Sequence, residues 1–296
     1  MKLYGDYHIH SEFSRDAKGT VDDIVRTAKE RGLVEVAITD HGWYTRSGVH
    51  PKHYKQIRAM IERAKKEHEI DVYFGIESNV RGTNGQIDAL DDYRRDFDLV
   101  LCGIHTGTRP ANIKSFFSFF LPNYFWAIFR KFPAGRVRKN TEVMKRIIER
   151  NDIDIWVHPN RYFKLDLVEV AKTCVERGTL IELNGKRISF RPIDFERMLA
   201  IGAKFIINSD SHSPEHVGRT NVATEFLKKV EYKDTDIINL SGRFRRGEAN
   251  LLAKAAATEE KLEQKTRKET RTERKTEKKQ VKAKLKREKV IKRKGD

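Results

Sequence analysis

Short apolar runs alternate with amphipathic stretches from the start of the chain to about Ala253. Seven of these runs have the length and the β-branched or aromatic content of strands. In chain order they are YGDYHIH, VEVAITD, DVYFGIES, FDLVLCGIH, DIWVH, TLIELN and KFIINSD. Between most of them apolar residues recur at helical spacing, over Val21–Arg31, Lys52–His68, Arg138–Arg150, Leu165–Arg177, Ile193–Ala200 and Glu215–Lys229. Strands that alternate with helices predict an α/β protein with a mostly parallel sheet.

About seven βα units favour a closed (β/α) barrel, although periodicity alone is also consistent with an open sheet. Local signals support the predicted helices. Thr20 is a good N-cap, and two acidic residues follow it in the first turn. Gly32, Gly178 and Gly202 each follow a helical run, where glycine commonly ends a helix.

Residues 106–133 break this alternation. They join a predicted strand to a predicted helix and contain the aromatic run FFSFFLPNYFWAIF. The run is too short to span a bilayer, and it contains Pro122. We expect an inserted helical hairpin that packs on the body of the protein; the alternative is an exposed lid or contact surface.

The charge of the chain is concentrated at its C-terminal end. The formal net charge is +17, and residues 254–296 carry 18 Lys and Arg against 8 Asp and Glu. This tail lacks aromatic residues and has few large aliphatic ones, so it cannot bury a core. We expect a catalytic domain over residues 1–253, followed by a basic tail that is disordered or forms a single solvated helix.

The sequence also bears on the compartment. No N-terminal signal peptide is visible. The two cysteines, Cys102 and Cys174, form no metal or redox motif and are expected to be core thiols. These features fit a reducing, cytoplasmic environment.

Histidines and acids occur where the predicted strands end. His8 and His10 are two residues apart on the first strand, so their side chains share a face. The others are His41, Glu77, His105, His158, Asp210 and His212, with Asp16 in the loop after the first strand. In a parallel barrel the carboxyl ends of the strands converge at one mouth. Imidazoles and carboxylates gathered there predict a site for zinc, manganese or iron.

An ordered set of short motifs carries a resemblance to a known family. The motifs are DYHIHSEFSRDA, ITDHG, GIES, GIHTG, WVHPN and NSDSH, over residues 6–212. Together they resemble the PHP (polymerase and histidinol phosphatase) family of metal-dependent phosphoesterases. The resemblance implies a distorted (β/α)7 barrel of PHP type, with two or three divalent ions at its mouth: zinc or manganese, with iron also competent.

The resemblance also implies an allocation of ligands. The first ion would be held by His8, His10, Glu77 and Asp210. Glu77 would bridge to a second ion, which His105 and His158 also bind. A third would be held by His41, His212 and Asp16, where many family members have a histidine instead of the aspartate. Hydrolysis is expected to depend most directly on Glu77, His158 and Asp210.

The implied reaction is hydrolysis of a phosphate ester by a metal-activated hydroxide. A small phosphomonoester, such as histidinol phosphate or a nucleotide, is the expected substrate. Arg109, Arg161 and Arg187 follow strand ends and are candidates to bind its phosphate, although each is also consistent with a solvated surface arginine. Asp6 and Asp40 are candidates to orient a ligating imidazole, or to serve a structural role.

Two alternatives remain. The family includes modules attached to bacterial DNA polymerases, some of them nucleases, so a nucleic-acid-associated protein that uses the basic tail is the second hypothesis. The tail mixes glutamates among its cations, as in KETRTERKTEKK, and lacks aromatic residues for base stacking, which weakens the case for DNA or RNA contact. The third alternative, an inactive family member, is disfavoured because the ligand set is nearly complete.

Overall fold

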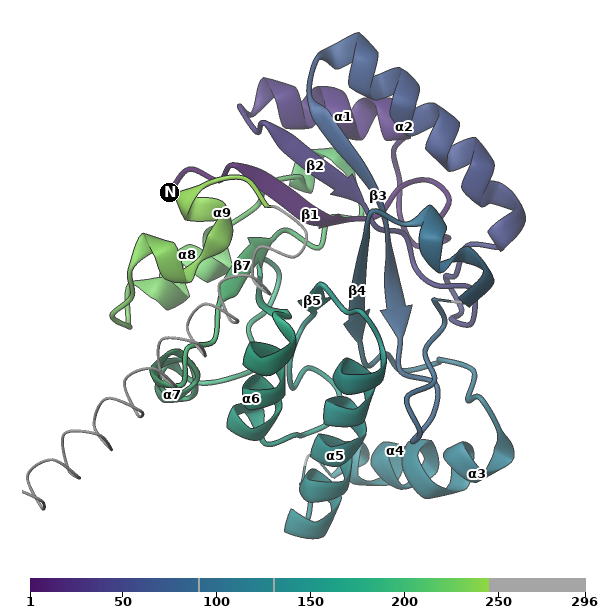
Figure 1. Cartoon of the computed structure of the whole chain (residues 1–296), viewed down its shortest axis with the longest axis vertical. Coiled ribbons are helices and arrows are strands. Elements are labelled where there is room, and N and C mark those ends of the chain that lie inside the picture. Colours follow the sequence, from purple (N-terminus) through teal and green to yellow (C-terminus); the bar gives the residue numbers. More distant parts are fainter. Residues whose placement is uncertain (90, 130, 245–296) are drawn as a thin grey trace, which may run out of the picture. The chain divides into compact units, whose positions relative to one another are not determined.

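Seven parallel strands form a nearly closed barrel (Figure 1). The computed structural model describes residues 1–89, 91–129 and 131–244. The strands are β1 (Gly5–Ile9), β2 (Glu35–Ile38), β3 (Asp71–Asn79), β4 (Leu99–Gly103), β5 (Ile155–Trp156), β6 (Leu180–Asn184) and β7 (Phe205–Asn208). Each strand pairs in parallel with the next one along the chain. All seven predicted strands and the predicted barrel are therefore confirmed.

Helices connect the strands along the outside of the barrel. They are α1 (Val21–Glu30), α2 (Tyr54–His68), α3 (Ile113–Ser115), α4 (Leu121–Ile128), α5 (Ala134–Arg150), α6 (Leu167–Arg177), α7 (Pro192–Ala200), α8 (Asn221–Leu227) and α9 (Ile238–Ser241). A π-helical segment (Phe116–Phe120) joins α3 to α4, and short 3-10 turns cover Pro51–His53, Asp91–Asp96, Pro214–His216 and Asp234–Asp236. Thr20 caps α1 through a capping box, and Gly178 ends α6 in a left-handed conformation, as predicted.

The prediction of one helix over Glu215–Lys229 was wrong. The chain forms a 3-10 turn at Pro214–His216, turns at Gly218, and only then begins α8. Gly218 has a φ of +70°, and its N–H donates to the buried Asp6 carboxylate at 2.8 Å. That bond turns the backbone away from a helical path, and glycine adopts the required φ at little cost.

Two apolar layers stabilise the barrel. The inner one is made of buried residues of the strands, together with Val157 directly after β5; its members are Tyr7, Ala37, Leu99, Leu101, Ile155, Val157, Leu180 and Ile206. The outer one joins the opposite faces of the strands to the helices. Buried strand residues thus divide between two faces, as alternation along a strand requires.

The gap between β1 and β7 is closed with the help of two asparagine side chains. Backbone pairing there is limited to a bridge between Ile9 and Ser211 among the described residues. Asn208 accepts a bond from the Tyr7 N–H at 3.1 Å. Asn239 accepts from the Ile207 N–H at 3.0 Å and donates to the carbonyls of Gly5 and Ile207 at 2.9 and 2.6 Å. These amides substitute for ladder bonds that the short strands do not supply.

Residues 106–133 contain one continuous helical segment, Ile113–Ile128, and not the predicted helical hairpin. The helical part packs on the body through Phe119 and Phe120, which are fully buried, while seven other apolar side chains are exposed. No helix in the described ranges is long and apolar enough to cross a membrane. The predicted basic tail, 254–296, lies outside the described residues.

Replacing Asn239 by alanine is expected to destabilise the protein. The change leaves one N–H and two carbonyls without their amide partner in a buried place, and each buried unsatisfied group costs about 1–3 kcal/mol. We expect the free energy of unfolding, measured in urea, to fall by about 2–4 kcal/mol. Asn221→Ala, at an exposed position, is the control and should change it by less than about 0.5 kcal/mol. Equal stabilities of the two variants would contradict the closing role.

Candidate metal centre

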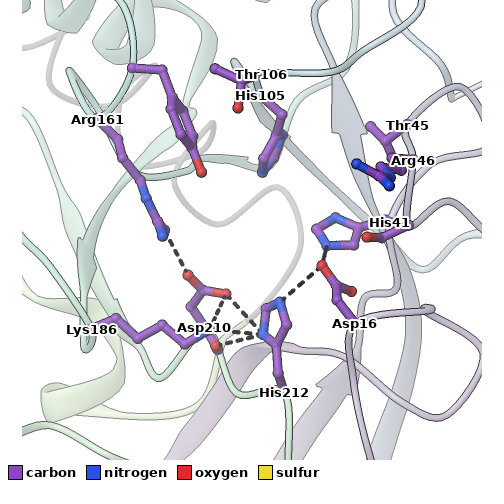
Figure 2. A pocket seen from close by; sticks show the side chains of 12 residues that line it. Asp16, His41, Thr45, Arg46, His105, Thr106, Arg161, Lys186, Asp210 and His212 are labelled. Carbon is purple, nitrogen blue, oxygen red and sulfur yellow. Dashed lines mark hydrogen bonds and ion pairs between the residues drawn. The ribbon is translucent and has the colours of Figure 1, made fainter.

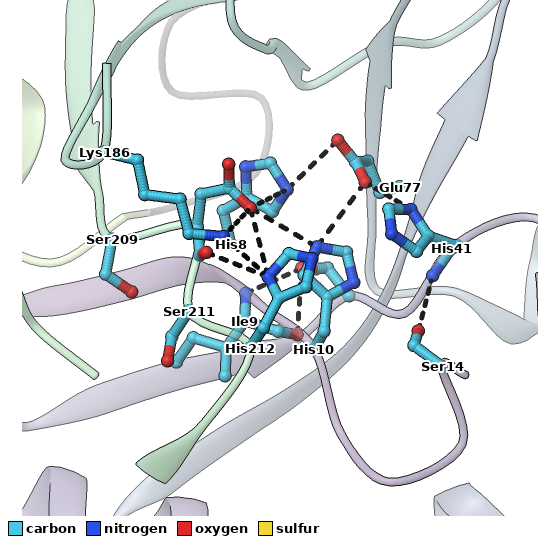
Figure 3. Close-up of polar contacts among 12 residues, drawn as sticks. His8, Ile9, His10, Ser14, His41, Glu77, Lys186, Ser209, Ser211 and His212 are labelled. Carbon is cyan, nitrogen blue, oxygen red and sulfur yellow. Dashed lines mark hydrogen bonds and ion pairs between the residues drawn. The ribbon is translucent and has the colours of Figure 1, made fainter. Parts of the chain in front are cut away.

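The carboxyl ends of the strands bring all nine predicted ligands into one cluster. Figure 3 shows five of them, His8, His10, His41, Glu77 and His212. β1 contributes His8 and His10 with the help of a bulge: its pairing with β2 gains one residue between Asp6 and Ile9. His41 follows β2 and forms an isolated bridge with Glu77 of β3. The remaining ligands follow β4, β5 and β7; they are His105, His158, Asp210 and His212.

Glu77 is the centre of this cluster. Its carboxylate is almost completely buried. Oε1 lies 3.1 Å from His8 Nε2, 3.1 Å from His105 Nε2 and 2.9 Å from His158 Nε2. Oε2 lies 2.7 Å from His41 Nδ1 and 3.5 Å from His10 Nε2. One carboxylate therefore contacts five imidazoles, the arrangement expected of a group that bridges cations.

Several nitrogen and oxygen atoms of the cluster lie close together but form no hydrogen bond. His8 Nε2, both ring nitrogens of His10, His41 Nδ1, Glu77 Oε2 and His105 Nδ1 are buried and have no hydrogen-bond partner within the described ranges. Buried polar atoms normally have partners, because an unsatisfied one costs free energy. Atoms bound to a common zinc ion lie about 3.3–3.7 Å from one another, close to the separations found here. The donor set and its unpaired atoms fit divalent cations.

Asp16 takes the place predicted for it. Its Oδ2 lies 3.3 Å from His41 Nε2 and 3.8 Å from His212 Nε2. Its side chain is 43% exposed, whereas Glu77 and the β1 imidazoles are buried. Asp16 and His212 therefore form the outer, solvent-accessible end of the cluster, and the buried His41 lies beneath them.

The cluster is continuous and does not divide into separate sites. Three groups have ligand atoms within 4.8 Å of one another: His10, His41 and His212; His8, His10 and Asp210; and His41, Glu77 and His105. The groups share His10 and His41, so each of these two imidazoles lies within reach of two of the groups. How the ligands are allocated among two or three ions stays a prediction.

Charges in the cluster compensate one another. Burial raises the pKa of Glu77, but the imidazoles of His105, His8 and His41 outweigh it and hold the pKa well below its ordinary value. Burial lowers the pKa of His41, yet Glu77 and Asp16 raise it to about 10. Burial lowers the pKa of His105 to about 4. The Glu77 carboxylate is therefore ionised at neutral pH. A proton on His41 balances its negative charge when no cation is bound.

Glu182, in the middle of β6, is a functional residue that sequence reasoning missed. It is fully buried, and its Oε1 accepts a bond from His8 Nδ1 at 2.7 Å. Its Oε2 accepts from the His158 N–H at 2.8 Å. A carboxylate on the far nitrogen of a ligating imidazole fixes the ring and its tautomer. The sequence does contain a signal for Glu182: it is an acidic residue inside the predicted strand TLIELN, at a position where an apolar residue is usual.

Asp6 and Asp40 do not bond to an imidazole. Asp6 accepts from the backbone N–H groups of Ser209 and Gly218, and so ties β1 to the segment after β7. Asp40 accepts from the hydroxyls of Ser11 and Ser14 at 2.6 and 2.7 Å. Both position the backbone that carries the ligands, which is the structural alternative considered for them.

The backbone is strained at two of the ligands. His158 and Asp210 have φ values of +33° and +52°, which residues other than glycine rarely adopt. Such conformations persist where the surroundings impose them, commonly at functional sites. Gly103 contributes to this packing, because a Cβ there would lie 2.5 Å from the His158 ring.

A cavity of about 210 Å³ opens above the cluster (Figure 2). Asp16, His41, His105, Asp210 and His212 form part of its lining. Arg161 Nη1 and Lys186 Nζ, also in the lining, lie 3.1 and 3.3 Å from Asp210 oxygens. Arg46 lines it too, whereas Arg109 and Arg187 are not among its lining residues. Of the three predicted phosphate-binding arginines, only Arg161 faces the cavity; Lys186 and Arg46 were not predicted.

Comparisons with known proteins agree with this geometry. A family model described as the PHP domain matches residues 6–272. Two relatives named "Probable phosphatase", from Shewanella sediminis and Shewanella loihica, are 26% and 28% identical over 250 residues, covering 81% of this chain and 91% of each relative. A histidinol phosphate phosphatase from Lactococcus lactis, solved with zinc, L-histidinol and phosphate, has a similar fold. Its TM-score is 0.51 at 17% identity, over 77% of this chain and 93% of that one.

A barrel mouth that gathers buried imidazoles around one shared carboxylate, beneath an open cavity, defines a metal-binding hydrolase. The chain belongs to the PHP domain family, since the matching model covers most of its length. The predicted family, the barrel and the phosphatase class are confirmed.

Replacing Glu182 by glutamine tests its positioning role. The amide keeps the size of the side chain but removes the charge that holds His8 Nδ1–H, and loss of such a partner typically lowers metal affinity about 10- to 100-fold. We expect that decrease for Zn²⁺ in a competition titration. Glu176→Gln, the same change at an exposed position on α6, should leave the affinity unaltered. Identical affinities for the two folded variants would rule out the role.

Proposed function

We propose that this protein hydrolyses a small phosphomonoester with the help of two or three divalent ions, zinc or manganese, with iron also competent, at the barrel mouth. The observation that carries the proposal is the Glu77 cluster at the base of an open cavity with cationic walls. The cluster supplies sites for the ions, and Arg161, Lys186 and Arg46 supply positive charge for a phosphate.

Divalent ions bound among these ligands would supply a hydroxide nucleophile at neutral pH and stabilise the charge that develops on the phosphoryl oxygens. The residues of the chain position the ions and the substrate. Glu77, His158 and Asp210 would hold the ions in fixed positions, because each is buried and held by further contacts. No serine or cysteine nucleophile is needed for this chemistry.

The cavity wall is suited to orient a terminal phosphate. Arg161 and Lys186 each use one N–H on Asp210 and have further donors available for phosphate oxygens. Tyr162 also lines the cavity, and its ring lies 5.9 Å from that of His105. A cavity of about 210 Å³ holds a phosphate with a small organic group, so a histidinol-phosphate-like molecule or a nucleotide is the substrate class we favour.

A second candidate function, in which the basic tail carries the domain to DNA or RNA, rests on residues 254–296. Those residues lie outside the described part of the chain. It stays a hypothesis from the sequence.

Removal of metal is expected to abolish hydrolysis. Treatment of the full chain with a chelator should reduce turnover of a phosphomonoester such as p-nitrophenyl phosphate to background, and added Zn²⁺ or Mn²⁺ should restore it. Glu77→Gln and His158→Ala should lower both turnover and metal content, measured by elemental analysis, because the first removes the predicted bridging ligand and the second a predicted ligand of the second ion. Glu62→Gln, at an exposed position on α2, is the control. Full activity in a metal-free preparation would refute the proposal.

Replacing Arg161 by alanine tests the phosphate contact. Loss of a hydrogen bond to a charged group costs about 1.5–3 kcal/mol, so kcat/KM should fall about 10- to 100-fold. Metal content should be retained, since Arg161 is not among the predicted ligands. Arg109→Ala is the matched control, because its side chain does not line the cavity, and it should leave kcat/KM within about twofold. Equal effects of the two substitutions would contradict this assignment.

A further inference from the structure

The helical segment between β4 and α5 has an apolar face that no described residue covers. α3, the π-helical segment and α4 form one continuous helix from Ile113 to Ile128. Its exposed side chains follow a four-residue repeat: Ile113, Phe117, Leu121, Phe125 and Phe129, with Phe116 and Ile128 beside them. We call these seven side chains the aromatic face.

The exposure of this face is large. Ile113 is 76% exposed, Phe117 59%, Phe125 52%, Ile128 77% and Phe129 57%. The opposite side of the same helix is buried through Phe119, Phe120 and Asn123. A helix that is apolar all round is normally buried all round. Single exposed apolar residues are common on protein surfaces, but a cluster of this kind marks a contact site.

The chain around the face is rich in basic residues, although Glu142 lies beside Lys114 and Arg138 in a surface pocket. Between Asp98 and Glu142 the sequence has no Asp or Glu. The same stretch contains seven Lys and Arg: Arg109, Lys114, Arg130, Lys131, Arg136, Arg138 and Lys139. Of these, Lys114, Lys131, Arg138 and Lys139 are exposed. The occupant of the face must therefore accept both aromatic side chains and a concentration of positive charge.

We propose that the aromatic face binds the surface of an anionic lipid bilayer. A helix of this length lies in the plane of the interface, with its aromatic and aliphatic side chains at the boundary of headgroups and acyl chains. Lys and Arg beside it are attracted to anionic headgroups. The absence of a membrane-spanning helix in the described ranges agrees with surface attachment.

Other occupants fit less well. A second copy of the chain placed on this face would bring two sets of like charges together. The chain's own residues 254–296 are basic and lack aromatic residues, so the same charges would repel them. An anionic bilayer satisfies both the apolar and the electrostatic character of the face.

The face lies next to the candidate metal centre. Figure 1 shows α3 and α4 beyond the carboxyl ends of β3 and β4. Tyr124 of α4 accepts a bond from the Gly107 N–H at 3.3 Å, and the adjacent Thr106 lines the cavity. Attachment would hold the mouth of the barrel near the bilayer. The proposal does not depend on the hydrolytic function.

Vesicle binding by the full-length protein tests the proposal. We expect co-sedimentation with vesicles of phosphatidylcholine and phosphatidylserine, and little with phosphatidylcholine alone. Phe117→Ser with Phe125→Ser should weaken binding about 100-fold or more, since burial of each ring contributes about a factor of ten. Ile193→Ser, at a 43% exposed position on α7, is the control and should bind as the unaltered protein does. The double variant should keep its phosphatase activity on a soluble substrate, as neither ring lines the cavity.

Trp126 distinguishes attachment through the face from attachment through the tail. It lies in α4 between Phe125 and Ile128, so brominated acyl chains should quench its fluorescence, and Trp126→Phe should remove that component. Equal vesicle binding by the double variant, with no quenching, would assign binding to the basic tail and overturn the proposal. Absence of vesicle binding by the unaltered protein would also overturn the proposal. If the double variant then lost self-association in light scattering, the aromatic face would be a contact between copies of the chain instead.

Discussion

One buried carboxylate dictates the arrangement of this barrel mouth. Glu77 lies among five imidazoles that come from four different strand ends, and its charge has to be balanced in a place from which water is excluded. An isolated buried charge is costly, so cations or protons must be present. The requirement explains why the ligands lie in the strands or directly at their ends, where the barrel can hold neutral and charged groups at separations of about 3 Å.

A second layer of polar contacts holds the first in place. Glu182 fixes the His8 ring and the His158 backbone at once, so the ligands of β1 and β5 depend on one side chain of β6. Asp6 ties β1 to the segment after β7, and Asn239 joins the same two strands at the other end. The contacts that close the barrel therefore also fix the positions of the ligands. The positive φ of His158 and Asp210 persists because both residues are held from several sides.

The sequence predicted the strands and the convergence of the candidate ligands at one mouth, because both follow from local pattern. Period-two alternation locates a strand, and strand polarity alone carries its last residues to the mouth. Contacts between residues far apart in the sequence could not be predicted in this way. Asp6 was a candidate to orient an imidazole, but it bonds backbone groups near Gly218, and that contact breaks a segment predicted as one helix. Glu182 and Lys186 required knowledge of which strand faces lie opposite each other.

The segment between β4 and α5 shows how one helix serves two environments. Its inner side supports the mouth: Phe119 and Tyr124 each pack 5.7 Å from the ring of Phe163, which follows the loop that carries His158 and Arg161. Burial of these rings anchors the inner side of the helix, whereas the outer aromatic rings stay exposed. A cluster of exposed apolar side chains commonly marks a contact site. The outer rings are therefore better explained by a contact beyond this chain than by packing within it.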